Sequence, residues 1–468
     1  MTQTANTLPV PSEIIEEFET ELGAINVKQD ARSVDKLSKD YYWYSPLLKA
    51  ELEEKKADFA VKIDSIEMLI SAVKLSFKHG LPISLRGGGT GNYGQMIPLY
   101  GGVLLDLSRM DKVLSVEDGV VRAEPGAKLA KIEKTARAAG YELRCMPSTW
   151  IKSSFGGFLC GGSGGIGSIT YGGIAFGDNM KSVSILTVES EPKIIKFEER
   201  ESLKALHTYG TTGILIEAEM RLGEKQNYQQ LILTGKTWED VSEFGDEIAR
   251  DSSITKRLVT GFEPTVPDYF VPIKEYLPAG CSALFLLIKQ SQAEAVSARA
   301  EQAGLVKTFD KPLSDPPAPP YITDYTWNHT TLHALTVDPT ITYLQAGYGE
   351  NWREQLSMLK ARFGDEFLIH TEWTIFNPKM GDETPEVVVG SIPIIKYKSP
   401  ERLQEIIDYC EEIGVGIANP HTYKLEEGGR HPDIEEKRAL KAEIDPKGIL
   451  NPGKMKTFEN NPFATASV

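Results

Sequence analysis

Apolar residues recur with helical spacing over residues 65–79, between two short apolar runs. Side chains three and four positions apart share one helix face, and Gly80 directly after the segment is a typical C-cap. Residues 59–63 before the helix and residues 82–85 after it have the length and composition of buried strands. The pattern predicts a β-α-β unit in the first part of the chain.

Further elements are predicted from the same periodicities. An amphipathic helix is expected over residues 13–23, and the Asp118-Gly119 pair predicts the turn of a hairpin over residues 113–123. We also expect helices over residues 128–140, 201–207 and 238–250, and strands over residues 103–107, 182–189, 193–197, 213–222 and 283–289.

Glycine density falls after about residue 223, and the pattern of elements changes there. A chain of 468 residues exceeds the size at which one core usually stops growing, so we place a domain boundary near residue 225. Proline-rich residues 311–320 are expected to form a surface loop or lid, because proline donates no backbone hydrogen bond. The predicted parts are a helical N-terminal extension (1–40), a glycine-rich domain (41–225), a central domain (226–440) and a C-terminal return with a tail (441–468).

Two glycine-dense runs, residues 86–94 and 156–173, carry the strongest chemical signal. Glycine has no side chain and tolerates positive φ, so successive N–H groups can converge on phosphate oxygens. Arg86 and Thr90 would add a positive charge and a hydroxyl. No helix follows the first run as the Rossmann fingerprint requires, and the chain has no Gly-Lys-Ser/Thr P-loop. Either run alone could be a structural turn, but the two together favour a dinucleotide, FAD above all.

These runs belong to an ordered series of motifs. The series comprises residues 86–92 (RGGGTGN), 104–113 (LLDLSRMDKV), 121–127 (VRAEPGA), 156–173, 209–218 (YGTTGILIEA) and 444–454 (IDPKGILNPGK). In this order the motifs resemble the FAD-binding domain of the vanillyl-alcohol oxidase/p-cresol methylhydroxylase (PCMH) superfamily. The nearest branch is the glycolate oxidase/D-lactate dehydrogenase group.

The resemblance implies an α+β fold, with a PCMH-type FAD-binding domain of two subdomains and an α/β cap domain whose antiparallel sheet holds the substrate. It implies that the first glycine loop and residues 161–167 grip the pyrophosphate and that residues 213–214 pass near the adenine. Residues 147–149 and 153–154 would contact the flavin or its ribityl chain, the alternative being an ordinary polar loop. The implied FAD-binding residues are Arg86, Gly87, Gly88, Gly89, Thr90, Gly91, Asn92, Pro147, Ser148, Ser154, Gly157, Gly161, Gly162, Ser163, Gly164, Gly167, Gly213, Ile214 and Asn451.

Many relatives attach the flavin covalently through a histidine of the first glycine loop. Here the matching position is Thr90, and residues 86–95 contain no histidine, which excludes that attachment. For Cys145 a buried thiol is favoured over a flavin link, and a link from His421 is left open. We therefore expect FAD to be held without a covalent bond.

Oxidation of an alcohol requires a group of near-neutral pKa to take the hydroxyl proton as hydride leaves carbon, which makes histidine the first candidate. His421 is our first choice for the base, because the strand-like segment at 417–424 would place it on one face with Asn419 and Tyr423. The alternative is a hydrogen-bonded structural histidine. His79 and His207 end predicted helices and are interpreted as structural.

Four further histidines lie in the central domain. His370 and Glu372 share a face of a predicted strand, but two ligands fall short of a metal site, and we predict no metal. His329 and His333 are four residues apart and would align on a helix, either lining the pocket or at a surface helix start. His431 is interpreted as a loop residue.

The motifs predict an FAD-dependent oxidoreductase that removes hydride from a hydroxyl-bearing carbon of a 2-hydroxy acid or related alcohol. His370, Tyr423 or His329 would position the substrate. Alternatives are an aryl-alcohol, phenol or sugar oxidase, a C=C reductase, and a non-catalytic FAD-binding subunit. A hydroxy-acid substrate requires a cation, and bidentate arginine suits a carboxylate best. The candidates are Arg257, Arg353, Arg362 and Arg430.

Composition and charge limit the kinds of partner that this protein is expected to bind. The formal net charge of −15 argues against nucleic acid and anionic membranes, which both need a basic surface. Four widely spaced cysteines suggest reduced thiols and a cytoplasmic protein. We expect no signal peptide and no membrane span. The electron acceptor (oxygen, quinone or a protein) and the presence of an oligomer or partner subunit are left open.

Overall fold

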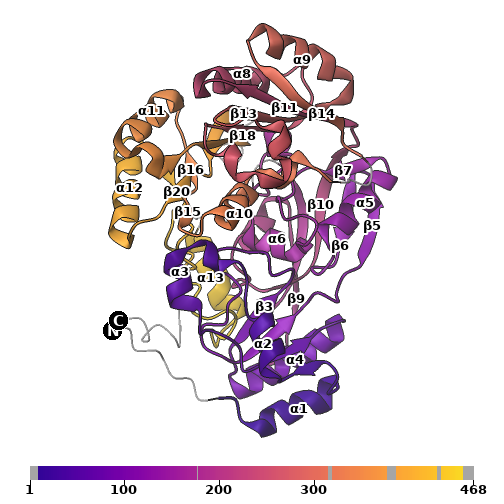
Figure 1. Cartoon of the computed structure of the whole chain (residues 1–468). Coiled ribbons are helices and arrows are strands. Elements are labelled where there is room, and N and C mark those ends of the chain that lie inside the picture. The colour runs from indigo at the N-terminus through magenta and orange to yellow at the C-terminus, as the bar shows by residue number, and fades with distance from the viewer. Residues whose placement is uncertain (1–8, 176–177, 315–318, 377–385, 430–433, 457–468) are drawn as a thin grey trace.

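The computed structural model describes residues 9–175, 178–314, 319–376, 386–429 and 434–456. Figure 1 shows the elements up to β10 in the lower part of the view and most elements from β11 to α12 in the upper part. The first group forms two sheets and the second forms two more.

The predicted β-α-β unit forms the first sheet. Its strand order is β1-β2-β4-β3, with β2, β4 and β3 parallel and β1 antiparallel. The strands are β1 (Val27–Lys28), β2 (Phe59–Lys62), β3 (Ile83–Arg86) and β4 (Val103–Asp106), and the helices around them are α1 (Ser12–Leu22), α2 (Ala31–Leu37), α3 (Pro46–Leu52) and α4 (Ile66–His79), with a 3-10 helix η1 (Tyr42–Tyr44). The N-terminal segment is therefore more than a helical extension, because β1 pairs with β2.

The second sheet has six antiparallel strands, in the order β5-β6-β10-β8-β9 with β7 also paired to β10. Asp118 and Gly119 both have positive φ at the predicted hairpin turn. The helix expected over residues 201–207 is the 3-10 helix η2 (Glu199–Ala205). The other elements are β5 (Val113–Glu117), β6 (Val120–Ala123), β7 (Tyr141–Leu143), β8 (Met180–Leu186), β9 (Ile194–Glu198), β10 (Ile214–Glu224), α5 (Leu129–Ala138), α6 (Phe155–Gly161) and α7 (Ser168–Tyr171).

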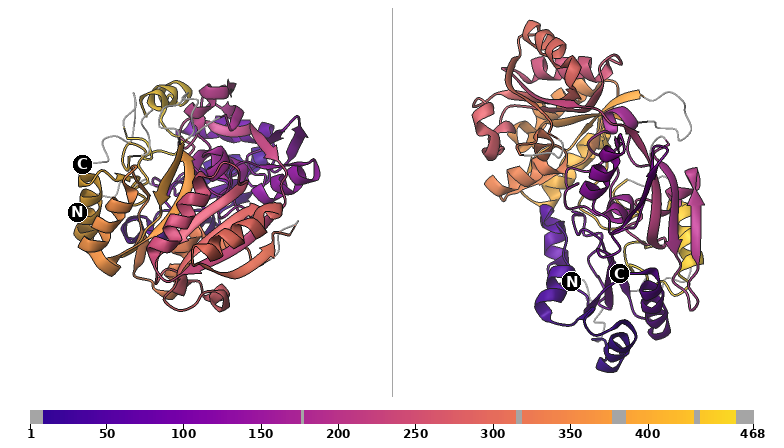
Figure 2. Two further views of the ribbon diagram at one scale, coloured as in Figure 1. Left: turned by 90° about the horizontal axis from the view of Figure 1, so that it is seen from above. Right: turned by 90° about the vertical axis from the view of Figure 1, so that its right-hand side faces the viewer.

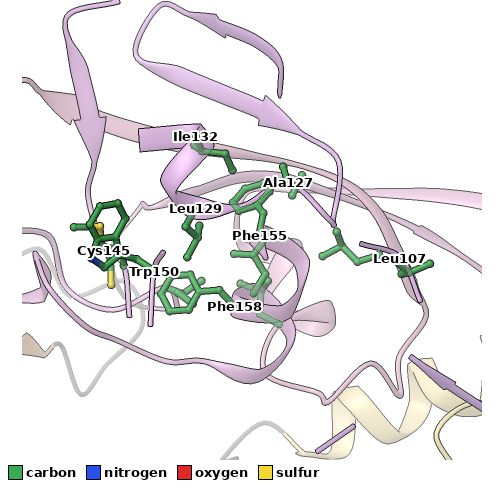
Figure 3. Packing of buried hydrophobic residues seen from close by; sticks show 14 of the residues in the cluster. Leu107, Ala127, Leu129, Ile132, Cys145, Trp150, Phe155 and Phe158 are labelled. Carbon is green, nitrogen blue, oxygen red and sulfur yellow. The ribbon is translucent and has the colours of Figure 1, made fainter. Parts of the chain in front are cut away.

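Apolar packing joins α5 and α6 in this domain. Figure 3 shows Leu129 and Ile132 of α5 beside Phe155 and Phe158 of α6, and all four side chains are buried. This packing places α6 in a fixed position at the start of the second glycine run.

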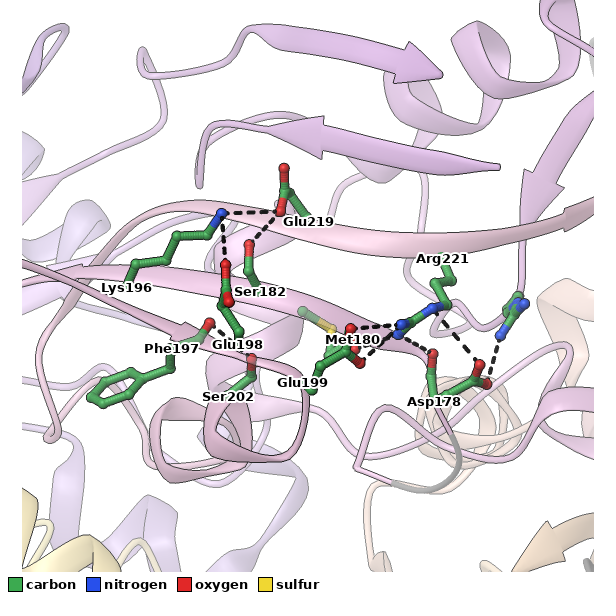
Figure 4. A network of polar contacts seen from close by, with 11 residues as sticks. Asp178, Met180, Ser182, Lys196, Phe197, Glu198, Glu199, Ser202, Glu219 and Arg221 are labelled. Carbon is green, nitrogen blue, oxygen red and sulfur yellow. Dashed lines mark hydrogen bonds and ion pairs between the residues drawn. The ribbon is translucent and has the colours of Figure 1, made fainter. Parts of the chain in front are cut away.

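Polar side chains of the central strand β10 bind η2 and the neighbouring strand β8. Arg221 of β10 binds both carboxylate oxygens of Glu199, at 2.8 and 2.9 Å, and Glu219 accepts from Ser182 at 2.6 Å (Figure 4). Arg221 and Glu219 are half-buried, and Ser182 is buried. None of these groups lines either of the two cavities described below, so we assign them a structural role.

The third sheet has eight antiparallel strands in the order β14-β11-β13-β12-β18-β19-β16-β21. Alternate residues of β13 face different cores: Leu284 and Leu286 pack with the outer helices, whereas Phe285 and Leu287 belong to the core shared with the first domain. Its strands are β11 (Tyr228–Gly235), β12 (Lys256–Phe262), β13 (Ser282–Lys289), β14 (Val306–Pro312), β16 (Ala346–Gly347), β18 (His370–Phe376), β19 (Glu386–Ser391) and β21 (Gly416–Ile417).

Most of the remaining elements cover this sheet or lie beside it, whereas the last helix, residues 434–444, packs against the first domain, where Val188 N donates to Ile444 O at 2.7 Å. The helices are α8 (Trp238–Arg250), α9 (Ala293–Gln302), α10 (Asn328–Val337), α11 (Trp352–Phe363), α12 (Pro400–Glu412) and α13 (Ile434–Ile444). A small sheet has the order β15-β20-β17, made of β15 (Ile341–Tyr343), β17 (Phe367–Leu368) and β20 (Ile394–Lys396). Short 3-10 helices are η3 (Pro267–Tyr269), η4 (Val271–Tyr276), η5 (Gln290–Gln292), η6 (Ile322–Tyr325) and η7 (Gly364–Glu366).

The predicted mixed fold with antiparallel sheets is confirmed, and two local expectations need comment. The strand expected over residues 417–424 is wrong beyond Ile417, where β21 ends. In the proline-rich segment, Pro312 ends the edge strand β14, and residues 315–318 lie outside the described residues.

The C-terminal segment returns to the first domain, as the two views of Figure 2 show. Ile83 of β3 donates its N–H to Ile449 O at 2.8 Å and accepts from Asn451 N at 2.6 Å. These bonds bring residues 449–451 to the strand that leads into the first glycine loop.

Candidate functional site: a two-part cavity at the glycine loops

A cavity of about 670 Å³ is lined by both domains. The first domain contributes the glycine loop at Thr90–Asn92, the segment 147–153 and parts of residues 157–173. The central domain contributes the start of α10 and residues of β16, β18, β19 and β21. A ligand in this cavity would touch groups from many separate parts of the chain.

A smaller cavity of about 110 Å³ adjoins the first. Thr90, Gly91, Gln95, Gly157 and Gly161 line both cavities. The smaller one is otherwise lined by Asp40, Leu85, Arg86, Gly87, Gly88, Gly89, Met96, Leu107, Pro125, Gly156, Cys160, Tyr209, Gly210 and Leu215. An elongated ligand could run past the first glycine loop from one cavity to the other.

The first glycine loop lies directly against the segment that precedes α6. A Cβ on Gly88 would lie 2.7 Å from Lys152 O and 3.0 Å from Ser154 N, and a Cβ on Gly87 would collide with Ser154 Oγ. The Ser154 hydroxyl accepts from Gly88 N at 3.0 Å and from Gly157 N at 3.2 Å. Only glycine permits this approach, so the loop and α6 form one cradle that fits a dinucleotide.

Arg86 positions the loop through the N-terminal segment. Its Nη1 donates to Leu37 O at 2.7 Å and to Lys39 O at 2.8 Å, and burial lowers the pKa of its guanidinium. Arg86 also lines the smaller cavity.

The structure sorts the predicted FAD-binding residues into three groups. The larger cavity is lined by Thr90, Gly91, Asn92, Pro147, Ser148, Gly157, Gly161, Gly162, Ser163 and Gly164. Arg86, Gly87, Gly88 and Gly89 line the smaller one. Ser154, Gly167, Gly213, Ile214 and Asn451 line neither.

The third group supports the cavity walls. Gly213 has φ +111°, and a Cβ there would meet Ile185. Asn451 donates from Nδ2 to Tyr209 O and, at 3.3 Å, to Gln95 O. Direct contact of residues 213–214 with a ligand therefore has no support from the lining of either cavity.

His421 does not line the cavity, contrary to our first choice of base. Its Nδ1 is 2.7 Å from Ser45 Oγ and its Nε2 is 2.8 Å from Tyr343 O. Tyr423 is also outside both linings, and its hydroxyl bonds to Glu51. Both side chains are buried in contacts between distant segments, so we no longer place either in the reaction.

His370 is buried behind the cavity wall. Its Nε2 is 2.9 Å from Glu372 Oε1, its Nδ1 is 3.1 Å from Ile392 O, and its ring stacks on Phe262. Glu372 itself lines the cavity, and its Oε1 accepts from Trp327 N at 2.7 Å. His370 therefore positions Glu372 rather than touching a ligand. Within the described residues, no group of three His, Cys, Asp or Glu side chains is placed to hold a metal.

His329 is the predicted histidine that lines the cavity. Its Nδ1 is 2.8 Å from Asp324 Oδ1, and Asp324 lines the cavity too. His333 lies one turn further along α10, with Nε2 3.1 Å from Asp324 O, and burial lowers the pKa of its ring. Asp324 was not predicted as a site residue, although it lies only five residues before His329 in the sequence.

Aromatic and aliphatic side chains of both domains form much of the cavity wall. Tyr41, Tyr44, Trp327, Leu332 and Ile392 line the cavity, and Trp327 has φ +54°, a conformation unusual for a bulky residue. The Trp327 N–H bond to Glu372 helps to hold this backbone. None of these residues was predicted, because they come from three distant parts of the chain.

The predicted carboxylate-binding arginines are placed elsewhere. Arg257 is buried 3.1 Å from Glu133, Arg353 is 3.3 Å from Asp246, and Arg362 is 3.2 Å from Glu405. None of these three arginines lines either cavity, and Arg430 lies outside the described residues.

Of the cysteines of the first domain, Cys160 lines one of the two cavities and Cys145 does not. Cys145 is buried outside both linings, and burial raises its thiol pKa to about 11. Cys160 lines the smaller cavity, and burial raises its pKa to about 12.

Comparison with known families identifies the first domain. Residues 57–194 match the model of an FAD binding domain. A solved structure of an alkyldihydroxyacetonephosphate synthase superposes with a TM-score of 0.69 at 18% identity, over 97% of this chain and 87% of that one. The superposition confirms the predicted fold, and the family model confirms FAD as the cofactor.

The names of several curated relatives describe FAD-linked or hydroxy-acid oxidation. An uncharacterized FAD-linked oxidoreductase of Mycobacterium tuberculosis is 24% identical over 223 residues, which is 46% of each chain, so the match spans about half of that relative. Glycolate oxidase subunit GlcD of Escherichia coli is 21% identical over 83% of this chain and 81% of its own. A D-lactate dehydrogenase of Anaerostipes hadrus is 27% identical over 35% of this chain and 34% of its own. These names agree with the predicted class, an FAD-dependent oxidoreductase. Within the described residues, no helix is long and apolar enough to cross a membrane.

Proposed function

We propose that this protein is an FAD-dependent oxidoreductase that removes a hydride from a hydroxyl-bearing carbon, with His329 as the base. The observation that supports this most directly is the His329–Asp324 pair in a cavity that also borders the glycine cradle. Bound FAD supplies a two-electron acceptor. The larger cavity would hold the flavin end and the substrate, and the smaller cavity the ADP end.

His329 would take the substrate hydroxyl proton on Nε2. Asp324 accepts from Nδ1 at 2.8 Å, which keeps Nε2 available as the acceptor and stabilises the ring once it is protonated. The His329 side chain is 13% exposed, so it reaches the cavity while α10 holds its backbone. Glu372 fixes the turn before α10 through Trp327 N and is a positioning residue.

The names of GlcD and the D-lactate dehydrogenase favour a 2-hydroxy acid. The side chains that line the larger cavity favour a second class of substrate, an aryl or other uncharged alcohol. Tyr41, Tyr44 and Trp327 offer ring faces to an aromatic substrate, and the carboxylates of Asp324 and Glu372 would repel a substrate carboxylate. Titration with both classes of substrate distinguishes the two possibilities.

The test is anaerobic titration of the FAD-loaded protein with 2-hydroxy acids, aryl alcohols and sugars, followed by absorbance. Loss of the oxidised-flavin bands with one class identifies the donor, and the rate at which air restores the bands separates an oxidase from a dehydrogenase. Bands that no donor bleaches would contradict the proposal and favour a reductase or a non-catalytic subunit.

His329→Gln tests the base. We expect bleaching by the same donor to slow by about 10²- to 10⁴-fold, the usual contribution of general base catalysis. His79→Gln is the matched control, since His79 pairs with Glu17 on the far side of the first sheet. Equal rates for wild type and His329→Gln would exclude His329 as the base.

Cofactor attachment and assembly stay proposals with simple tests. Acid denaturation and filtration should release FAD into the filtrate if no covalent bond is present. GlcD is named as a subunit, so a partner or an oligomer is proposed here too, and mass measurement of the native protein would test it.

A further inference from the structure

Asp324 places a carboxylate at the central-domain wall of the larger cavity. Its side chain is 44% exposed, and its Oδ1 is 2.8 Å from His329 Nδ1. This bond engages one carboxylate oxygen, and an ionised carboxylate can accept hydrogen bonds at both. Asp324 can therefore orient His329 and bind a ligand donor at the same time.

The other carboxylate in the lining, that of Glu372, is already engaged. Glu372 is 2% exposed, and its Oε2 accepts from Thr260 Oγ1 at 2.5 Å. Its Oε1 accepts from Trp327 N at 2.7 Å and lies 2.9 Å from His370 Nε2. A carboxylate with partners at both oxygens has little capacity left for a ligand. A ligand that needs a carboxylate would therefore bind Asp324.

Lys152 is the one lysine or arginine among the described residues that line this cavity. It belongs to the first-domain wall, where its carbonyl oxygen is the atom that a Cβ on Gly88 would meet at 2.7 Å. Lys152 thus lies beside the first glycine loop, where the FAD diphosphate would neutralise its charge. The described part of the central-domain wall offers no lysine or arginine to pair with a ligand carboxylate.

Aromatic rings lie in the same cavity as Asp324. Four of them line it and pack in one cluster, namely Tyr41, Tyr44, Tyr93 and Trp327. Tyr41 and Tyr44 meet edge to face with ring centroids 6.0 Å apart, and Trp327 follows Asp324 by three residues. The face of an aromatic ring carries partial negative charge and attracts cations, including quaternary ammonium groups. The carboxylate and the rings together fit a cationic ligand.

We propose that Asp324 makes the larger cavity selective for cations, so that the alcohol oxidised there carries an ammonium group. The ammonium would bind the Asp324 carboxylate and a ring face, and the hydroxyl would meet His329. As hydride leaves carbon for FAD and the hydroxyl proton passes to His329, an amino alcohol becomes an amino aldehyde or amino ketone. This inference rests on the proposed function and names its substrate class. It disfavours hydroxy acids, whose carboxylate Asp324 would repel.

Three probes of similar shape that lack the alcohol group test the charge selectivity of the FAD-loaded full chain: benzylammonium, benzamide and benzoate. The measurement is calorimetric titration at about pH 7.5, where the amine probe is protonated. Benzylammonium should bind about 10- to 100-fold more tightly than benzamide, the usual contribution of a hydrogen bond to a charged group. Benzoate should bind most weakly. Asp324→Asn keeps the shape and removes the charge, so benzylammonium and benzamide should then bind alike.

Asp338→Asn is the matched control, because it removes the same charge from the far end of α10. Asp338 follows the last residue of that helix, bonds Thr340 N and lines neither cavity, so the ranking of the probes should not change. Equal binding of benzylammonium and benzamide to wild type would overturn the inference, and this comparison does not depend on any variant. The inference also fails if Asp324→Asn keeps the ranking of the control, or if benzoate binds most tightly and loses this advantage in Lys152→Met.

Anaerobic bleaching separates this inference from the proposed oxidation. At equal concentration, para-aminomethyl benzyl alcohol should bleach the flavin faster than para-methyl benzyl alcohol or glycolate. Faster bleaching by either of the last two would leave the oxidation standing and overturn the selectivity. Bleaching by no donor would contradict the oxidation, and the probe titration would still decide whether Asp324 selects cations.

Discussion

Replacing Gly88 with alanine tests the close approach on which the cradle depends. The added Cβ would lie 2.7 Å from Lys152 O, 3.0 Å from Ser154 N and 3.1 Å from Ser153 Cα, and all three are backbone atoms. No side chain can rotate away to relieve these contacts. The glycine loop and the segment before α6 must therefore separate by roughly 0.7 Å to restore ordinary van der Waals distances.

That separation has a calculable effect on FAD binding. Adding one methyl group to a packed interior costs about 1–3 kcal/mol. In the variant this strain is smallest when the glycine loop moves away from the segment before α6. If FAD binds only when the loop and this segment are in contact, the dissociation constant for FAD rises by about 5- to 150-fold. The Gly88 N–H bond to Ser154 Oγ, now 3.0 Å, would lengthen with the same movement.

The assay is titration of flavin-free protein with FAD, followed by quenching of flavin fluorescence. Gly349→Ala is the matched control, because its nearest contact would be the Asn351 side-chain oxygen at 3.2 Å and it lines neither cavity. We expect that control to bind FAD like wild type. A dissociation constant for Gly88→Ala within twofold of the wild-type value would refute the packing argument.

Two further predictions concern stability. Glu372→Ala removes the acceptor of buried donors that include Trp327 N and His370 Nε2. The free energy of unfolding in urea should therefore fall by about 3–5 kcal/mol. Glu372→Gln keeps one acceptor and should lose less stability, and equal losses in the two variants would count against this account. Hydrogen bonds, first from the Ser253 hydroxyl, lower the pKa of Asp251 to about 2. Because the folded-state pKa lies below the unfolded one, the stabilisation is present above about pH 4 and is lost as the pH falls toward 2. The melting-temperature difference between wild type and Asp251→Asn should therefore shrink between about pH 5 and pH 3, and a constant difference would contradict the assignment.

Local patterns predicted many of the elements. The helix expected over residues 238–250 is α8 with the same bounds, and the Asp-Gly turn at Asp118 falls where the hairpin turns. These features depend on side chains within one or two turns of each other, so periodicity and turn chemistry suffice to predict them.

The sequence did not show which of the candidate histidines faces the cavity. His421 has a polar, strand-like sequence environment, but its Nδ1 bonds Ser45, 376 residues earlier, and its Nε2 bonds Tyr343 O. His329 looked like an ordinary helix start, and only the fold shows that it shares the cavity with Asp324. Nothing in the local sequence distinguishes a histidine used in packing from one that faces a cavity.

The sequence by itself determined the dinucleotide cradle, because glycine spacing and the order of the motifs are properties of the chain alone. It also determined most helices and strands, whose patterns are short-range. Only the tertiary structure decided which histidine reaches the cavity, which arginines are used in ion pairs and that Asp324 lies at the larger cavity. The physical reason is that these outcomes depend on contacts between residues far apart in the chain, and such contacts form only when the sheets and helices pack together.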